Sequence, residues 1–332
     1  MTSLPIGVVG AGSWGTALAI HLARAGHVVR LWAREPEVVA GIRATRRNPI
    51  YLSDVECPPS VEPTGDPMEA VAGARIVVIV VPSEFVAATL KNLPRIPEGV
   101  PVVSATKGFD PERHVRMSEL ILERHPAAPV AALSGPTFAR EVAQGHPTAA
   151  VIASPDEALA TRLQTVLGSR EFRLYTNRDI VGVEAGGALK NVMAIATGLA
   201  DGLALGENAR AALVTRGLAE LTRLAVALGA SPLTMAGLAG LGDLVLTCTG
   251  SLSRNRRLGI ELARGRTQAA VETETRMIAE GARTVLSAIA LARRHGISMP
   301  IAAEVAAVLF EAKPPRDALA ALLARVARPE GG

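Results

Sequence analysis

Aromatic side chains are scarce in this chain and make up only 3% of its 332 residues. Proteins that hold single-stranded nucleic acid stack its bases on aromatic rings, so this composition argues against such a surface. The net charge is only +4, and no Lys/Arg-rich tail is present. This mild positive balance fits a small anionic ligand. We therefore expect a small-molecule ligand and no nucleic-acid partner.

Cysteine is almost absent, since the chain has only Cys57 and Cys248. The two form no CxxC pair and no metal-ligand spacing, so we expect reduced thiols and no structural metal. The longest purely apolar strand-like run, Ile76–Val81, is far too short to span a bilayer. The first residues run directly into a motif and leave no room for a signal peptide. These observations predict a cytoplasmic protein without membrane insertion.

Lysine is the third scarce residue, with four lysines among 35 basic side chains. Arginine does not release its proton, whereas lysine can when its surroundings lower its proton affinity. Lys91 and Lys313 lie in polar or proline-rich connections and are expected at the surface. Lys107 and Lys190 lie in motifs and are candidates for chemistry.

The N-terminal segment has the order of a βαβ unit. An apolar strand (Ile6–Val9) precedes a glycine turn (residues 10–15), a helix (Thr16–Ala25) and a second strand (Val28–Trp32). This order within about thirty residues is typical of dinucleotide-binding folds.

Strands and helices alternate over the first half of the chain, and only helical periodicity follows from about Asp179. The pattern predicts an α/β fold with a doubly wound, mostly parallel sheet, followed by an all-helical C-terminal domain. We expect domains at residues 1–185 and 186–328. The further predicted strands are Ile76–Val81, Val102–Ala105, Val130–Leu133, Ala149–Ile152 and Phe172–Tyr175. The further predicted helices are Pro111–Arg124, Glu157–Leu167, Val183–Leu203, Asn208–Leu228, Ala282–Arg294 and Ile301–Phe310.

The glycine turn carries the first functional signal. Gly10, Gly12 and Gly15 allow a tight turn and a close backbone approach, so that a pyrophosphate can lie at the N-terminus of the next helix. A merely structural turn is the alternative, but the position between a strand and a helix favours cofactor binding.

Arg34 follows the second strand, where a site specific for NAD usually offers an acidic side chain. Its guanidinium suits a 2′-phosphate, so we expect NADP to be accepted at least. The alternative is an ordinary surface arginine in an arginine-rich chain.

Two loops follow predicted strands at the edge where parallel sheets bind ligands. One contains Lys107 in Ser104–Gly108, and the other contains Gly135 and Thr137 in the sequence GPTFA. Because both loops lie at the carboxyl ends of strands, we expect them to meet at one site.

Lys190 lies in an apolar helix, after two glycines that leave space beside its ammonium group. Desolvation at such a position lowers the pKa of a lysine, which prepares it to exchange a proton with an alcohol during hydride transfer. The alternative is a lysine whose side chain extends to solvent.

A glycine-dense segment ends at Asp243, and Ser253-Arg254-Asn255 follows shortly after it. A hydroxyl, a guanidinium and an amide in one turn can hold a phosphate group. Taken alone, the basic run is more often a solvated patch.

Together these segments resemble the bacterial NAD(P)-dependent glycerol-3-phosphate dehydrogenases. The resemblance covers nearly the whole chain, from GAGSWGTALA through ATKG, SGPTFAREVA, GGALKNVMAIATGLADGL, GLAGLGDLVLTCTG and SRNRRLG to AEGARTVLSAIALARRHGISMPI. It implies a Rossmann-type domain followed by a helical domain. It also implies the reduction of dihydroxyacetone phosphate to sn-glycerol 3-phosphate for phospholipid synthesis, and a homodimer.

The resemblance also implies individual roles. Lys190 resembles the family's proton acceptor in alcohol oxidation, and so the proton donor in reduction. The implied cofactor positions, beside the three glycines, are Ser13, Trp14, Arg34, Tyr51, Lys107, Ala139, Arg254, Ile278 and Glu280. The implied substrate positions are Lys107, Gly135, Thr137, Lys190, Asp243, Ser253, Arg254 and Asn255. Many relatives have histidine at the position of Arg34, which favours NADP for this chain.

Two other classes are considered. A dehydrogenase of a hydroxyacid or a ketopantoate-like substrate would share the glycine turn and the lysine, but would lack SRNRR after GLGD. A catalytically inactive nucleotide-binding regulator would have lost Lys190 or Asp243, and this chain has both.

Overall fold

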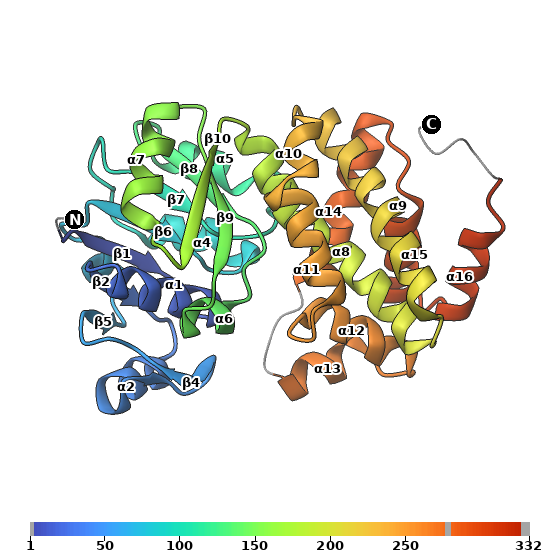
Figure 1. Ribbon diagram of the computed structural model, residues 1–332, viewed down its shortest axis with the longest axis horizontal. Helices are drawn as coiled ribbons and strands as arrows, with labels where there is room; N and C mark the ends of the chain where they lie inside the picture. Colours follow the sequence, from blue (N-terminus) through green and yellow to red (C-terminus); the bar gives the residue numbers. More distant parts are fainter. Residues whose placement is uncertain (1–2, 276–279, 327–332) are drawn as a thin grey trace.

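The computed structural model describes residues 3–275 and 280–326. Two lobes lie side by side along the long axis of the molecule (Figure 1). One contains a sheet covered by helices, and the other is helical. The predicted α/β fold with a helical C-terminal part is therefore confirmed.

The sheet has the strand order β10-β9-β8-β7-β6-β1-β2-β5. All neighbouring pairs run parallel except β8 and β9, which are antiparallel. The order reverses between β1 and β6, and ligands of open parallel sheets bind at such a switch point. The strands are β1 (Pro5–Val9), β2 (Val28–Trp32), β5 (Val61–Thr64), β6 (Ile76–Ile79), β7 (Val102–Ser104), β8 (Val130–Ser134), β9 (Thr148–Ala153) and β10 (Phe172–Asn177).

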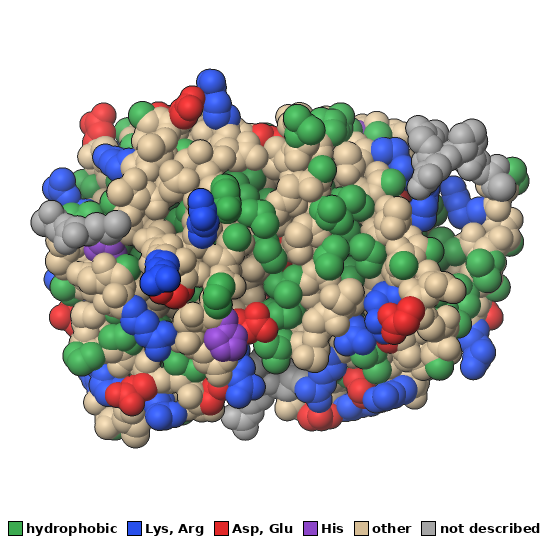
Figure 2. Space-filling model, in the orientation of Figure 1, with side chains coloured by type: hydrophobic (Ala, Val, Ile, Leu, Met, Phe, Trp, Pro, Cys, Tyr) green, Lys and Arg blue, Asp and Glu red, His purple; other side chains and the backbone are tan. Residues whose placement is uncertain are grey.

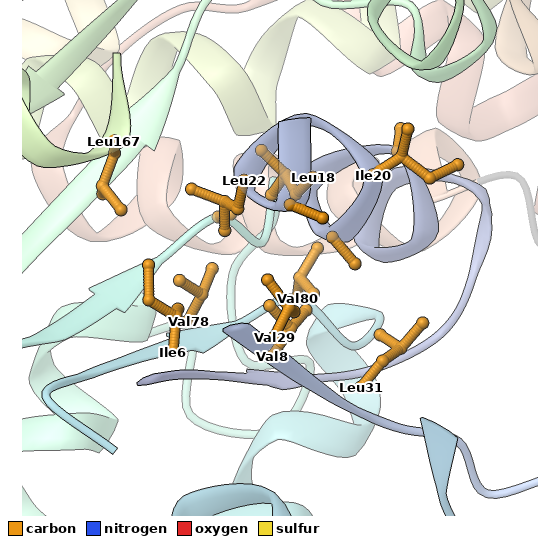
Figure 3. Packing of buried hydrophobic residues seen from close by; sticks show 14 of the residues in the cluster. Ile6, Val8, Leu18, Ile20, Leu22, Val29, Leu31, Val78, Val80 and Leu167 are labelled. Atoms are coloured by element: carbon orange, nitrogen blue, oxygen red, sulfur yellow. The ribbon is translucent and has the colours of Figure 1, made fainter. Parts of the chain in front are cut away.

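The central strands are apolar on both faces because helices cover both. Side chains alternate between two cores, so that Val8 packs in one and Val9 in the other. The first core lies under α1 (Ser13–Arg24), α6 (Ala139–Gln144) and α7 (Glu157–Leu167), and Figure 3 shows its contacts beneath α1. The second lies under α3 (Pro67–Val71), α4 (Ser83–Asn92) and α5 (Met117–Arg124).

A short helix and a small hairpin lie outside the main sheet and were not predicted. They are α2 (Pro36–Thr45), β3 (Arg47–Asn48) and β4 (Leu52–Glu56). The strands of the hairpin are mostly polar, and the apolar residues of α2 (Val38, Val39 and Ile42) cover too short a stretch to mark a helix clearly. The turn of the hairpin and β4 nevertheless line one end of the cleft described below.

Helix α8 (Ile180–Gly202) forms the centre of the helical lobe (Figure 1). By length and composition it is the one helix of the described segments that is apolar enough to cross a membrane, but 89% of its apolar window is buried, as expected of a core helix. Around it lie α9 (Gly206–Ala227), α10 (Pro232–Ala236), a π-helical turn η1 (Leu238–Gly242), α11 (Asp243–Thr249), α12 (Arg254–Ala263), α13 (Gln268–Thr275), α14 (Glu280–His295), α15 (Pro300–Phe310) and α16 (Pro315–Leu323).

Several predicted helix starts differ from the structure, and for two of them a local capping or turn contact gives the reason. The helix expected from Pro111 begins only at Met117, because the carboxylate of Asp110 accepts the backbone N–H groups of residues 112 and 113 and forms a turn instead. Helix α8 begins at Ile180, earlier than expected, because the side chain of Asp179 accepts the N–H of Gly182 and caps it. Residue 185 therefore lies inside α8, and a domain division there stays a prediction.

Candidate active site

A cleft of about 810 Å³ opens at the carboxyl edge of the sheet and receives side chains from both lobes. Three predicted residues, Gly15, Gly135 and Asp243, lie behind its walls, and Ile278 lies outside the described residues. The predicted site residues that line it are Gly10, Gly12, Ser13, Trp14, Arg34, Tyr51, Lys107, Thr137, Ala139, Lys190, Ser253, Arg254, Asn255 and Glu280.

The glycine turn connects β1 to α1 at one end of this cleft. Gly10 has a φ of +121°, and a Cβ on Gly15 would lie 1.9 Å from the carbonyl oxygen of Gly10. By contrast, no atom lies within 4 Å of where a Cβ of Gly12 would be. The turn is thus packed on its inner side and open on its outer side, next to the N-terminus of α1. This shape fits the pyrophosphate of a dinucleotide.

The buried amide of Asn48 holds the turn in place. Its Nδ2 donates to the carbonyl oxygen of Ala11 and to Oγ1 of Thr16, both at 2.8 Å. Its Oδ1 accepts the N–H of Tyr51 at 3.1 Å, and Oγ of Ser13 donates to the carbonyl oxygen of Tyr51 at 2.9 Å. Asn48 therefore ties the turn to the β3–β4 hairpin, a role that the sequence did not reveal.

Arg34 lies just past β2, with 64% of its side chain exposed. Its guanidinium is 5.1 Å from the ring centroid of Phe85 and donates to Oε1 of Glu35 at 2.9 Å. The hydroxyl of Tyr51 donates to the same oxygen at 3.3 Å. A guanidinium, an aromatic face and a carboxylate thus surround this end of the cleft, which suits an adenosine ribose with or without a phosphate.

Two lysines share one carboxylate where the lobes meet. Asp243, fully buried at the start of α11, accepts from Lys107 at 2.8 Å through Oδ2 and from Lys190 through Oδ1. Lys107 also donates to the carbonyl oxygen of Gly135 at 2.8 Å and to Oγ1 of Thr137 at 3.0 Å. The structure thus brings together the two loops that the sequence placed at one edge.

The ammonium group of Lys190 is buried in this cluster. It also donates to Oγ1 of Thr247 at 2.8 Å. Burial lowers the pKa of Lys190 to about 7, with Asp243 opposing the shift and Lys107 adding to it. The pKa of Glu280 is raised by burial, against the opposing charges of Arg254 and the two lysines. A lysine that titrates near neutral pH can both give and take a proton.

The sequence suggested that the two glycines before Lys190 leave space beside its ammonium group, and this prediction is wrong. A Cβ on Gly186 would lie 2.5 Å from the carbonyl oxygen of Ala239, and one on Gly187 would lie 2.3 Å from Oγ of Ser134. Gly187 also adjoins the stem of Lys107. Glycine is needed here because the helix backbone itself packs against its neighbours.

The Ser253-Arg254-Asn255 turn begins α12 and closes the other side of the cleft. Oγ of Ser253 accepts the N–H of Arg256 at 3.2 Å, and Oδ1 of Asn255 accepts the N–H of Gly281 at 3.0 Å. Within the described ranges Arg254 has no hydrogen bond or ion pair, so its guanidinium is available to a ligand. The neighbouring Arg256 instead binds Asp201 at 2.6 Å.

Comparison with known proteins finds the family that the sequence resembles, over both halves of the chain. Models of the N-terminal and C-terminal parts of NAD-dependent glycerol-3-phosphate dehydrogenase match residues 5–160 and 179–320. Glycerol-3-phosphate dehydrogenase [NAD(P)+] of Koribacter versatilis is 52% identical over 326 residues, covering 96% of this chain and 97% of that one. This chain belongs to the NAD-dependent glycerol-3-phosphate dehydrogenase family.

Further members agree with this assignment. The enzyme of the same name from Geobacter sp. (strain M21) is 49% identical over 330 residues and 98% of both chains. The crystal structure of glycerol-3-phosphate dehydrogenase from Coxiella burnetii superposes with a TM-score of 0.92, at 39% identity, over 97% of this chain and 99% of that one. Family membership decides between the dehydrogenase classes that the sequence raised.

Several residues of the dehydrogenase cleft were not predicted. Thr247 follows Asp243 by four residues, so helical periodicity would have placed it on the same face. Glu35 adjoins Arg34 in sequence, but its bond from Tyr51 depends on the unpredicted hairpin. Phe85 comes from α4, and nothing in the sequence connects it with Arg34.

Proposed function

We propose that this cleft reduces dihydroxyacetone phosphate to sn-glycerol 3-phosphate, with Lys190 as the proton donor. The observation that carries the proposal is the pair of ammonium groups on Asp243, placed between the glycine turn and the guanidinium of Arg254, which forms no ion pair with the described residues. The cleft thus offers a dinucleotide site at one end, an anion site at the other and an acidic proton between them.

The reaction needs a hydride and a proton, and the chain supplies the proton. When held at the glycine turn, a reduced nicotinamide dinucleotide would supply the hydride for the ketone carbon. The ketone oxygen then becomes an alkoxide, which Lys190 stabilises by its charge and protonates. Asp243 holds both ammonium groups in place, and Lys190 regains its proton from solvent after release of the product. Oxidation of the alcohol uses the same steps in reverse.

The substrate phosphate is assigned to the start of α12. Arg254 presents a guanidinium fork, and the amide nitrogen of Asn255 and the N-terminus of the helix add donors. The remaining substrate positions are Lys107, Gly135, Thr137 and Ser253. Gly135 acts through Lys107, whose ammonium group donates to its carbonyl oxygen.

The family uses NAD or NADP, and we assign NADPH as the favoured cofactor of this chain. The support is the exposed guanidinium of Arg34 stacked on Phe85, where a 2′-phosphate would lie. Glu35 at the same place offers an acceptor for unphosphorylated ribose, which is consistent with use of both cofactors.

The biological setting follows the same proposal. We place the enzyme in the cytoplasm, where it supplies glycerol 3-phosphate for phospholipid synthesis. We also propose a homodimer, supported by exposed apolar side chains on the helical lobe such as Leu233 and Leu323, which are 83% and 76% exposed. Figure 2 shows hydrophobic side chains spread over one face of this lobe. Sedimentation analysis tests the dimer directly.

One experiment tests the function and the role of Lys190 together. Purified protein should oxidise NADPH only when dihydroxyacetone phosphate is added. Lys190→Ala should lower kcat by about 10²–10⁴-fold, the usual contribution of general acid catalysis. NADPH binding, measured by fluorescence titration, should remain because the glycine turn is untouched. Absence of activity in the parent protein would refute the function, whereas near-normal turnover in the variant would refute the role of Lys190.

A further inference from the structure

A buried carboxylate outside the cleft joins the two lobes. Glu184 lies on α8, six residues before Lys190, and only 4% of its side chain is exposed. Its Oε1 accepts the N–H of Ser118 at 2.8 Å, and its Oε2 accepts from Oγ of Ser118 at 2.5 Å and from Arg116 at 3.0 Å. Ser118 is the second residue of α5, which belongs to the sheet lobe. A side chain of one lobe therefore caps a helix of the other.

The capping contact is directional and fully satisfied. Both carboxylate oxygens have donors, and they lie at the positive end of α5. Burial raises the pKa of Glu184, while Arg116 and the hydrogen bonds from Ser118 oppose that shift. A buried ion pair adds little net stability compared with apolar packing, so its value here lies in the geometry that it imposes.

The same turns of α8 pack against segments that carry residues of the reaction site. Gly186 packs on Ala239, just before the helix of Asp243, and Gly187 packs on Ser134 and on the stem of Lys107. Both contacts bring the backbone of the helix close to its neighbours. The position of α8 along its axis therefore determines where Lys190 meets Asp243.

We propose that Glu184 is a positioning residue for Lys190. By docking α8 on the N-terminus of α5, it sets the axial position of α8 and so the placement of the Lys190 ammonium group against Asp243 and Thr247. This inference rests on the proposed role of Lys190 as proton donor. Glu184 does not line the cleft, so it acts through the helix and not by contact with the substrate.

The chain contains a matched control for this proposal. Glu220, on α9, is also buried, and its two carboxylate oxygens accept the N–H groups of Ile301 at 2.7 Å and Ala302 at 3.3 Å. It thus caps α15 as Glu184 caps α5, but both of its helices belong to the helical lobe. Glu220→Gln perturbs a buried helix cap without touching the contact between the lobes.

The test compares Glu184→Gln with Glu220→Gln. In Glu184→Gln an NH2 group replaces one of the two oxygens and faces a donor of Ser118 or of Arg116, so the docking changes while side-chain volume is kept. We expect kcat to fall at least about 10-fold, since small misplacement of a reacting group is costly. KM for both ligands should stay within about threefold, because binding contacts are unchanged. Glu220→Gln should lower the melting temperature similarly but leave kcat within about twofold.

A double-mutant cycle shows whether Glu184 works through Lys190. Adding Glu184→Gln to Lys190→Ala should cause no further loss of kcat, because the positioned group is already gone. Fully additive losses of kcat in the double mutant would overturn the proposal. The proposal would also be overturned if Glu184→Gln and Glu220→Gln had the same kcat while Lys190→Ala is inactive. Near-normal turnover of Lys190→Ala would instead refute the proposed role of Lys190, on which this inference rests.

Should Glu184→Gln fail to fold, Glu184→Asp keeps the charge and shortens the side chain by one methylene group. We expect it to retain a melting temperature near that of the parent and to lose kcat about 10-fold, since its carboxylate cannot reach Ser118 without moving α8. Full activity of the aspartate variant would overturn the proposal, because charge alone would then suffice.

Discussion

Asp243 is a single carboxylate between two ammonium groups. When Lys190 is protonated, the two ammonium groups carry one positive charge more than Asp243 compensates, so the cluster favours a negatively charged ligand oxygen beside it over a neutral one. At the scale of individual residues, burial of these charged groups makes them stabilise a developing negative charge more strongly.

The lowered pKa of Lys190 predicts a break in the pH dependence of the reaction. Reduction needs the ammonium form, so kcat/KM should be level below about pH 7 and fall above it, given a pKa of about 7. Oxidation needs the neutral amine, so its kcat/KM should rise up to the same pH and then level off. Initial rates between pH 5.5 and 9, in roughly half-unit steps, test this. A break above pH 9 in both directions would contradict a desolvated lysine.

Arg34 is predicted to distinguish the two cofactors. Arg34→Ala should raise KM for NADPH about 10- to 100-fold, as expected from loss of a charged hydrogen bond, and should leave KM for NADH nearly unchanged. Because the side chain is 64% exposed, the difference should shrink as salt is added. NADH serves as the internal control, and equal losses with both cofactors would show that Arg34 does not bind the 2′-phosphate.

At the scale of elements, two substitutions in the glycine turn are predicted to affect cofactor binding and folding separately. Gly12→Ala should leave the melting temperature nearly unchanged, because its Cβ meets no atom within 4 Å, yet it should weaken NADPH binding about 10-fold or more. Gly15→Ala should destabilise the fold by about 1–3 kcal/mol, because its Cβ would lie 1.9 Å from a carbonyl oxygen. Calorimetry and fluorescence titration of both variants measure the two effects. Equal behaviour would mean that the turn has no open side.

The elements that the sequence predicted best are those with a single strong period. Helix α7 was predicted at its observed bounds, and β2 likewise, because apolar side chains repeat regularly within each. The β3–β4 hairpin was missed because its stability comes from tertiary contacts such as those of Asn48. The start of α5 was wrong because a local turn at Asp110 competes with the helix.

At the scale of the whole molecule, the site depends on both lobes. The sequence predicted Lys107 and Lys190 separately, but it did not reveal that Asp243 joins them. Such contacts span up to 136 residues, and no periodicity reports a contact between distant elements. The resemblance to a family supplied roles for these residues, while the structure supplied their geometry.

Binding of the cofactor is predicted to stabilise both lobes together. A ligand bound only by the folded chain at 100 times its Kd adds about 2.7 kcal/mol to the free energy of unfolding. Because the cleft includes residues of both lobes, NADPH should raise the melting temperature in one transition by several degrees. Scanning calorimetry with and without NADPH tests this. Two transitions, of which only one shifts, would show that the lobes unfold independently.

Helix α8 has a consequence for recombining this protein with its relatives. The sheet ends at Asn177 and α8 starts at Ile180, so this short connection looks like the natural point at which to join halves from different parents. A chimera cut there would take Glu184 from one parent and the helix that it caps, α5, from the other. A chimera that takes α5 and the first turns of α8 from the same parent would keep Glu184 with the helix that it caps. Such a crossover does not follow the boundary between the two lobes.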